Sequence, residues 1–170
     1  AAVDTGSQLI ILPIYYNKKA FSGSVESEGE YFDLAITPFL VTEDHWLGEE
    51  NCVKLAAQAA VPLTTKQPVN SAQNLNNGEL ATIVGHPKCQ QRTLLKMAGE
   101  EIKTAWTAPS CTQYNYLRGR AGSEAENMHA FGAVMVEIIE GKPFCTNLVQ
   151  GGDGSLMFYD RDYEQFYYNS

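Results

Sequence analysis

The sequence FGAVMVEIIEGKPFCTNLV, residues 131–149, does most to decide the fold because it predicts a β-hairpin. Residues 131–139 and 144–149 are rich in β-branched and aromatic side chains, which fit a pleated, half-buried surface. Gly141 lies between these two runs, and glycine favours a tight turn because it tolerates a positive φ. We therefore expect two antiparallel strands joined at Gly141.

The sequence on either side of the hairpin extends this prediction to a whole sheet. A turn sequence, GGDG at residues 151–154, precedes a third apolar run at 156–159, so the C-terminal part predicts an antiparallel meander. Near the other end, residues 9–16 form a continuous apolar run, which is typical of a strand covered on both faces. We expect an α/β or α+β fold with a mixed sheet and an antiparallel C-terminal meander.

The middle of the chain alternates short apolar runs with long polar segments. Residues 80–84, 92–97 and 102–107 are expected strands, whereas residues 52–61 fit a helix or a strand equally well. The polar segments at 62–78 and 112–125 are expected to be loops. Loops of this length inside a compact domain are usually functional.

Length and charge limit the classes of protein to consider. A chain of 170 residues is expected to be a single domain, 1–170, and the helix-end pattern of residues 1–6 before an apolar run suggests a piece of a longer protein. The net charge of −8 argues against wrapping DNA or RNA with clustered cations. A bound divalent metal would reverse the local charge, so a metal-dependent nuclease stays compatible, and a divalent metal is the cofactor to consider. An acidic surface also suits a basic protein partner.

The four cysteines are expected to be free thiols. No pair has CxxC spacing, and no Cys-His spacing indicates a zinc site. Cys52 and Cys145 lie in apolar runs, where a thiol behaves as a small hydrophobic side chain. Free thiols favour a reducing, cytosolic compartment. No apolar run approaches the ~20 residues of a membrane span, so no membrane association is expected.

Two histidines next to expected strands are the candidate catalytic residues, together with Lys88. His86 follows the run at 80–84, and His129 precedes the run at 131–139. If these runs pair antiparallel, both imidazoles lie at the same edge of a sheet, where loops on a rigid scaffold carry function. The alternative is that His86 is a structural histidine beside the turn made by the following proline.

Four further residues are candidates for contacting substrate. Arg118, Arg120 and Tyr116 combine charge and an aromatic ring in one polar segment, which suits a phosphate and a stacked base. Lys18 follows the run at 9–16, and ligands of open α/β sheets bind at the carboxyl ends of strands. The alternative is a solvated loop whose tyrosines pack onto the core.

Glu137 needs a separate explanation. It lies about 26 Å along the strand from His129 at ~3.3 Å per residue, so the two cannot share a site on a straight strand. With a two-residue turn at Gly141-Lys142, Glu137 lies opposite Thr146. We expect a solvent-facing Glu–Thr pair.

Several of these segments, in this order, resemble a family of tailed-bacteriophage proteins. Residues 84–88 contain a His-Pro-Lys turn, and residues 129–137 have the pattern of a His followed by Gly-Ala and Val-Glu. The other segments that carry the resemblance are residues 9–18, 114–116 and 153–155. In the family a second histidine commonly stands at the position of Met128. The resemblance implies a phage origin and a location in the host cytoplasm rather than a particular reaction.

These observations lead to two functional hypotheses. The first is a phage-encoded protein that acts on nucleic acid or nucleotides, such as a phosphodiester hydrolase or nuclease. The alternative is a non-enzymatic acidic protein that binds a host or phage partner, or a virion structural protein. Clustering of His86, His129 and the Arg118 segment around one cleft would favour the first hypothesis.

Overall fold

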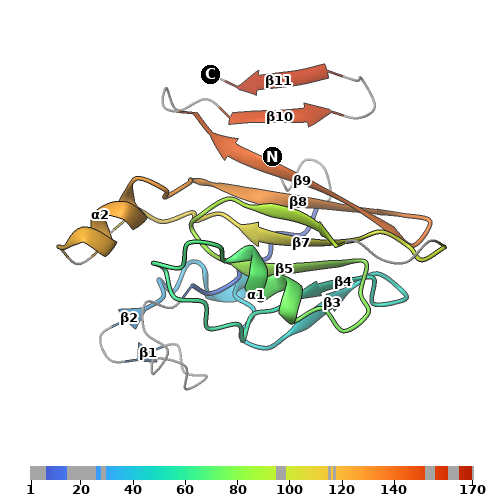
Figure 1. Cartoon of the computed structure of the whole chain (residues 1–170), viewed down its shortest axis with the longest axis horizontal. Helices are drawn as coiled ribbons and strands as arrows, with labels where there is room; N and C mark the ends of the chain where they lie inside the picture. The colour runs from blue at the N-terminus through green and yellow to red at the C-terminus, as the bar shows by residue number, and fades with distance from the viewer. Residues whose placement is uncertain are drawn as a thin grey trace.

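The computed structural model of this chain has an α+β fold (Figure 1). It describes residues 7–14, 26–27, 30–94, 99–114, 116, 118–151, 156–160 and 165–169. Its two main sheets are a five-stranded mixed sheet and a four-stranded antiparallel sheet. A short ribbon, β1 (Glu26–Ser27) with β2 (Glu30–Tyr31), lies at one end.

The five-stranded sheet has a parallel centre and antiparallel edges. Its order is β3 (His45–Leu47), β4 (Val53–Leu55), β5 (Ala81–Gly85), β7 (Lys103–Ala108) and β6 (Gln91–Leu94). Strands β4, β5 and β7 are parallel, whereas β3 and β6 run antiparallel to their neighbours. The connection from β4 to β5 contains helix α1 (Val69–Asn74), which lies across one face of the sheet (Figure 1).

The central strand β5 is buried on both faces, which explains its continuous apolar run. On the helix side, Val84 packs with Val69 and Ala72 of α1. On the other side, Ile83 belongs to a second cluster, against which Val136 of the four-stranded sheet packs. All five residues of β5 are buried, and alternation is therefore absent because neither face meets water.

The four-stranded sheet confirms the predicted hairpin and meander. Its order is β11 (Gln165–Asn169), β10 (Leu156–Asp160), β9 (Lys142–Gln150) and β8 (Gly132–Ile139), with every neighbouring pair antiparallel. In Figure 1 these strands follow one another away from β7. Local alternation and turn residues are sufficient to specify such a sheet, because each strand pairs with the next one in sequence.

The expected pairing of Glu137 with Thr146 is wrong. The turn residues are Glu140 and Gly141, whose φ angles are 50° and 75°. Two successive positive φ values are typical of the type I′ turn that matches the twist of a hairpin. The turn therefore begins one residue earlier than expected, and Glu137 lies opposite Phe144.

The expected strand at 9–16 is not formed in its described part, residues 7–14. Ile11 makes an isolated parallel bridge with Leu40, and residues 15 and 16 lie outside the described residues. Ile10 and Leu12 of this segment pack against the core of the five-stranded sheet, whereas Leu9 is exposed. A Cβ on Gly85 would lie 3.0 Å from the carbonyl oxygen of Pro13, so the segment crosses directly over the end of β5. Continuous hydrophobicity here indicates burial without strand pairing.

Two further expectations also need correction. Strand β5 pairs with β4 and β7, not with β8, because a parallel β–α–β crossover places β4 beside it. The polar segments expected to be loops contain α1 and α2 (Arg120–Glu126), which are short helices with polar outer faces. Residues 52–61 begin with strand β4, and all four cysteines are free thiols, as expected.

Candidate functional site

A pocket lies at the carboxyl edge of the parallel strands. Pro87 follows β5, and Ser110 and Thr112 follow β7, so two neighbouring parallel strands deliver their next residues to the same edge. The pocket is lined by Ile14, Leu63, Pro87, Ser110, Thr112, Gln113, Tyr114, Tyr116 and His129. Its volume is about 160 Å³, the space of roughly five waters at ~30 Å³ each, which suits a single ring system. The carboxyl edge of parallel strands is the usual ligand position in open sheets.

His129 is the centre of an aromatic cluster in this pocket. The ring centroids of Tyr114 and Tyr116 are each 5.8 Å from the His129 ring, and that of Phe131 is 4.8 Å away. All three pairs meet edge to face. Edge-to-face contact is a favoured geometry of aromatic pairs, so these contacts stabilise the arrangement of the rings.

Hydrogen bonds determine which ring nitrogen of His129 carries the proton. Nε2 lies 3.0 Å from the carbonyl oxygen of Thr112, and Nδ1 lies 2.8 Å from the hydroxyl of Tyr116. A carbonyl oxygen only accepts, so Nε2 carries the hydrogen. In the neutral ring Nδ1 is then an acceptor, and the Tyr116 hydroxyl donates to it.

His86 is held in the same way but does not line the pocket. Its side chain is 0% exposed, with Nε2 3.1 Å from the Pro62 carbonyl and Nδ1 3.1 Å from the backbone N–H of Lys88. Burial lowers the pKa of His86 to about 4, against the raising effect of the Pro62 hydrogen bond and with a further lowering from the Lys88 charge. His86 is therefore neutral near pH 7 and holds the turn that carries Pro87 into the pocket wall.

The segments that follow the two histidines meet without any pairing of β5 with β8. The backbone N–H of Ala130 donates to the carbonyl of Pro87 at 2.8 Å. Ser110 forms an isolated parallel bridge with Phe131, and its N–H donates to the Ala130 carbonyl at 3.0 Å. Loop hydrogen bonds thus bring the chain around His129 to the end of β5, although His129 alone of the two histidines lines the pocket.

The candidate cations that the structure describes, Lys88, Arg118 and Arg120, are not among the residues that line the pocket. The Nζ of Lys88 donates to the Lys66 carbonyl at 2.7 Å. Arg120 pairs with Glu124 on α2 at 3.1 Å, and its side chain is 93% exposed. Arg118 is exposed, and Lys18 lies outside the described residues. Of the six candidates that the structure describes, His129 and Tyr116 line the pocket, so the clustering of His86, His129 and the Arg118 segment around one cleft is met only in part, without His86.

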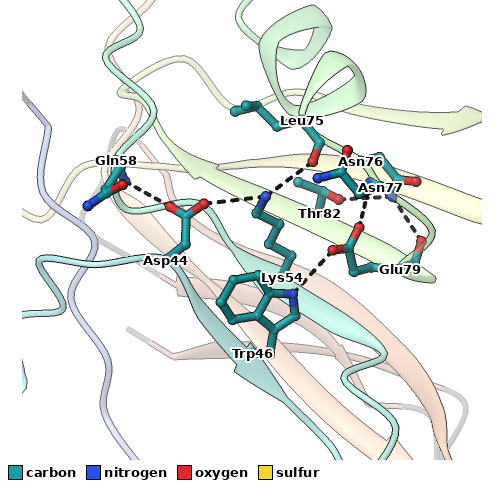
Figure 2. Close-up of polar contacts among 9 residues, drawn as sticks. All are labelled: Asp44, Trp46, Lys54, Gln58, Leu75, Asn76, Asn77, Glu79 and Thr82. Atoms are coloured by element: carbon teal, nitrogen blue, oxygen red, sulfur yellow. Dashed lines mark hydrogen bonds and ion pairs between the residues drawn. The ribbon is translucent and has the colours of Figure 1, made fainter.

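A second polar cluster surrounds Lys54, which the sequence analysis did not single out (Figure 2). Lys54 lies in β4 and is 5% exposed. Its Nζ lies 3.3 Å from a carboxylate oxygen of Asp44 and 3.4 Å from the carbonyl of Leu75, at the end of α1. It also lies 5.5 Å from the ring centroid of Trp46, within range of a cation–π contact. The signal available in the sequence was a charged residue between apolar neighbours in a short strand.

Glu79 completes this cluster. It accepts hydrogen bonds from Trp46 Nε1 at 3.2 Å and from the backbone N–H of Asn77 at 2.7 Å. Burial opposes its ionisation, but these hydrogen bonds and the nearby charge of Lys54 lower the pKa of Glu79. The cluster ties β3, β4 and the α1–β5 connection together, so we interpret it as structural.

The described part of the chain has no group of three or more His, Cys, Asp or Glu residues placed to hold a metal ion. In the same part, no helix has the length and hydrophobicity needed to cross a bilayer.

The fold and pocket define an α+β protein with an aromatic site at the carboxyl edge of a mixed sheet. No protein-family model and no solved structure matches the chain. The chain is similar to Protein A1 of Escherichia phage T5, with 27% identity over 159 residues. The match covers 91% of this chain and 28% of the length of the T5 protein. This similarity supports a phage origin for the chain.

Proposed function

We propose that this phage protein acts on nucleic acid or nucleotides, and that the pocket around His129 receives a single base. The observation that carries the proposal is the composition of the pocket. Its wall is made by the rings of Tyr114, Tyr116 and His129, with apolar residues and the side chains of Ser110 and Gln113 around them. Among the described residues that line the pocket there is no Lys, Arg, Asp or Glu.

The balance of charge favours a base over a phosphate as the group that enters the pocket. A net charge of −8 opposes the broad phosphate contacts that drive duplex binding. Stacking of a base on an aromatic side chain contributes about 1–3 kcal/mol and needs no cation. An unpaired base, from a single strand or a free nucleotide, therefore suits this site better than a duplex.

The hydrolase form of this proposal gives the candidate residues different roles. His129 lines the pocket and accepts a hydrogen bond from the Tyr116 hydroxyl, so it is the candidate group for proton transfer. His86 is a positioning residue, because both of its ring nitrogens bind backbone groups. Lys88, with Arg118 outside the pocket, would contact the phosphate.

Binding of labelled single-stranded oligonucleotides, measured by fluorescence anisotropy, tests the proposal. Tyr114→Ala should weaken binding by about tenfold or more, because one stacking contact is lost. Phe39→Ala is the matched control, since Phe39 is 41% exposed and Tyr114 is 50% exposed, and Phe39 does not line the pocket. Equal affinity of both variants and the unaltered protein, with unchanged circular dichroism, would contradict the proposal.

The non-enzymatic interaction protein is the second candidate, and one observation favours it. Ile139 and Phe144, which are 38% and 41% exposed, lie on the same face of the β8–β9 hairpin beside its turn. Exposed apolar side chains at one place are typical of protein contacts. Failure of oligonucleotide binding together with an intact fold would favour this candidate.

A further inference from the structure

We infer that the phosphates of a bound single strand run from the pocket over a cationic strip made by Lys66, Lys88 and Arg92. This inference rests on the proposed function, because it takes a nucleic acid strand as the ligand. It adds a path for the backbone of that strand and assigns a role to Lys66 and Arg92, which the pocket itself does not use.

The cationic strip begins beside the wall of the pocket. Pro87 lines the pocket, and Lys88 is the next residue in the chain. The Nζ of Lys88 donates to the carbonyl of Lys66 at 2.7 Å. Lys66 follows Leu63, another residue that lines the pocket, by three positions. A strand whose base enters the pocket therefore has two lysines beside it.

Arg92 extends the strip along the face of the sheet that carries α1. It lies opposite Ala105 in the β6–β7 ladder, and Ala105 packs with Val69 of α1. Opposite residues of an antiparallel pair project to the same face, so Arg92 projects to the helix side. There it donates to the side-chain oxygens of Asn70 at 2.6 Å and Gln73 at 3.1 Å. Both bonds use Nη1, and a guanidinium has five N–H donors, so donors remain for a phosphate.

The cations of the strip are available to an anion. Lys66 and Arg92 are exposed, and Lys88 is half-buried. Within the described part of the chain, none of the three forms an ion pair with a carboxylate. Between positions 62 and 94 the sequence contains these three cations and one acidic residue, Glu79, which belongs to the polar cluster of Figure 2. The strip is therefore a local excess of positive charge on a protein of net charge −8.

The composition of the strip fits a phosphate backbone. Lysine, arginine, asparagine and glutamine side chains make most of the contacts that position a nucleic acid by its phosphates. Amides accompany the cations here, because Asn70 and Gln73 contact Arg92 and the Nε2 of Gln90 donates to the Lys66 carbonyl at 3.3 Å. The four residues from position 88 to position 92 span about 13 Å at ~3.3 Å each, so contact with both ends takes more than one phosphate.

The salt dependence of oligonucleotide affinity, measured by anisotropy, tests the inference. For single strands, the logarithm of the binding constant falls with the logarithm of the salt concentration, with a slope of about −0.7 per phosphate contacted. Replacing the three cations together, as Lys66→Gln, Lys88→Gln and Arg92→Gln, should make this slope shallower by about 2. The affinity lost between 50 and 200 mM salt should then be roughly 20-fold smaller.

Single variants keep the test independent of any effect on folding. Arg92→Gln removes one exposed charge and should make the slope shallower by about 0.7, whereas Arg92→Lys keeps the charge and should keep the slope. Lys142→Gln is the matched control, because Lys142 is an exposed cation at the start of β9, outside the strip. It should leave the slope unchanged, and a reduction equal to that of Arg92→Gln overturns the inference.

An oligonucleotide of abasic sugar–phosphate units separates the strip from the pocket. Its binding should keep the dependence on the three cations, whereas Tyr114→Ala should no longer weaken it. Binding of ordinary oligonucleotides that depends on Tyr114, with an unaltered slope in the folded triple variant, overturns the inference and leaves the proposed function standing. Absence of oligonucleotide binding overturns the proposed function, and this inference with it. A polyglutamate peptide that competes as well as an abasic strand of equal charge overturns the inference, because the strip then fits an acidic protein partner.

Discussion

The buried imidazole of His86 predicts a loss of stability on mild acidification. Burial lowers its pKa to about 4, whereas an unfolded histidine has a pKa near 6.5. Between these two values the unfolded chain binds a proton that the folded chain does not bind. The free energy of unfolding should therefore be unaffected by His86 above pH 6.5 and fall as the pH drops from 6.5 to 4.

The expected loss is a sizeable fraction of the stability of a domain. The gap between a pKa of about 4 in the fold and 6.5 in the unfolded chain corresponds to roughly 3 kcal/mol, at about 1.36 kcal/mol per pKa unit. Because the side chain is 0% exposed, solvent does not screen it. Domains of this kind have about 5–15 kcal/mol of total stability, so a change of this size is readily measured.

Urea unfolding followed by tryptophan fluorescence, over a pH series from 7 to 4, measures this loss. His86→Gln removes the titrating group. Over this pH range the free energy of unfolding of the variant should therefore fall by about 3 kcal/mol less than that of the unaltered protein. His45→Gln is the matched control, because His45 is exposed on the edge strand β3, and it should follow the unaltered protein. Ionised Glu79, whose pKa is lowered in the fold, also stabilises the folded protein. This contribution is lost only as the pH falls below about 4.5. Parallel curves for His86→Gln and the unaltered protein would refute the reasoning.

Two further predictions concern other buried groups. Asp44→Asn should lower the free energy of unfolding, measured with urea, by about 3 kcal/mol. This value is at the lower end for a broken buried ion pair because the Asp44 side chain is 24% exposed. Lys54→Met should cost less, and the double variant should recover stability relative to Asp44→Asn alone; a double variant no more stable than Asp44→Asn would be evidence against a buried pair. Burial raises the pKa of the Cys145 thiol to about 12, so with a chromogenic disulfide reagent the exposed Cys111 should react first in the folded protein. Unfolding without reductant should then reveal four free thiols, and a smaller number would show a disulfide.

The C-terminal sheet shows what local sequence patterns can predict. The strands of the β8–β9 hairpin are neighbours in sequence, so alternation and one turn glycine specify their pairing. The error of one residue in the turn has a local cause as well. Glu140 takes a positive φ, which is uncommon for a residue that is not glycine, and the pattern favoured Gly141-Lys142 instead.

The candidate site residues show what local sequence patterns cannot predict. The sequence pointed to His86, Lys88 and His129 because of their residue types and their places beside strands. It could not distinguish the histidine in the pocket from the one that is fully buried, because burial depends on which segments pack around each ring. Lys54 was missed for the same reason, since its partners Asp44 and Leu75 come from the edge of the sheet and from a helix end.

By itself, therefore, the sequence determined the class of fold, the C-terminal meander, the free cysteines and the short list of residues worth testing. These properties depend on composition and on contacts between neighbours in the chain. Only the tertiary structure decided that β5 lies between β4 and β7 and that residues 9–14 cross over the sheet. It also decided that residues as far apart in the sequence as Ile14 and His129 line one pocket. The physical reason is that parallel pairing and a shared pocket join residues distant in sequence, and their contacts leave no periodic pattern in the chain.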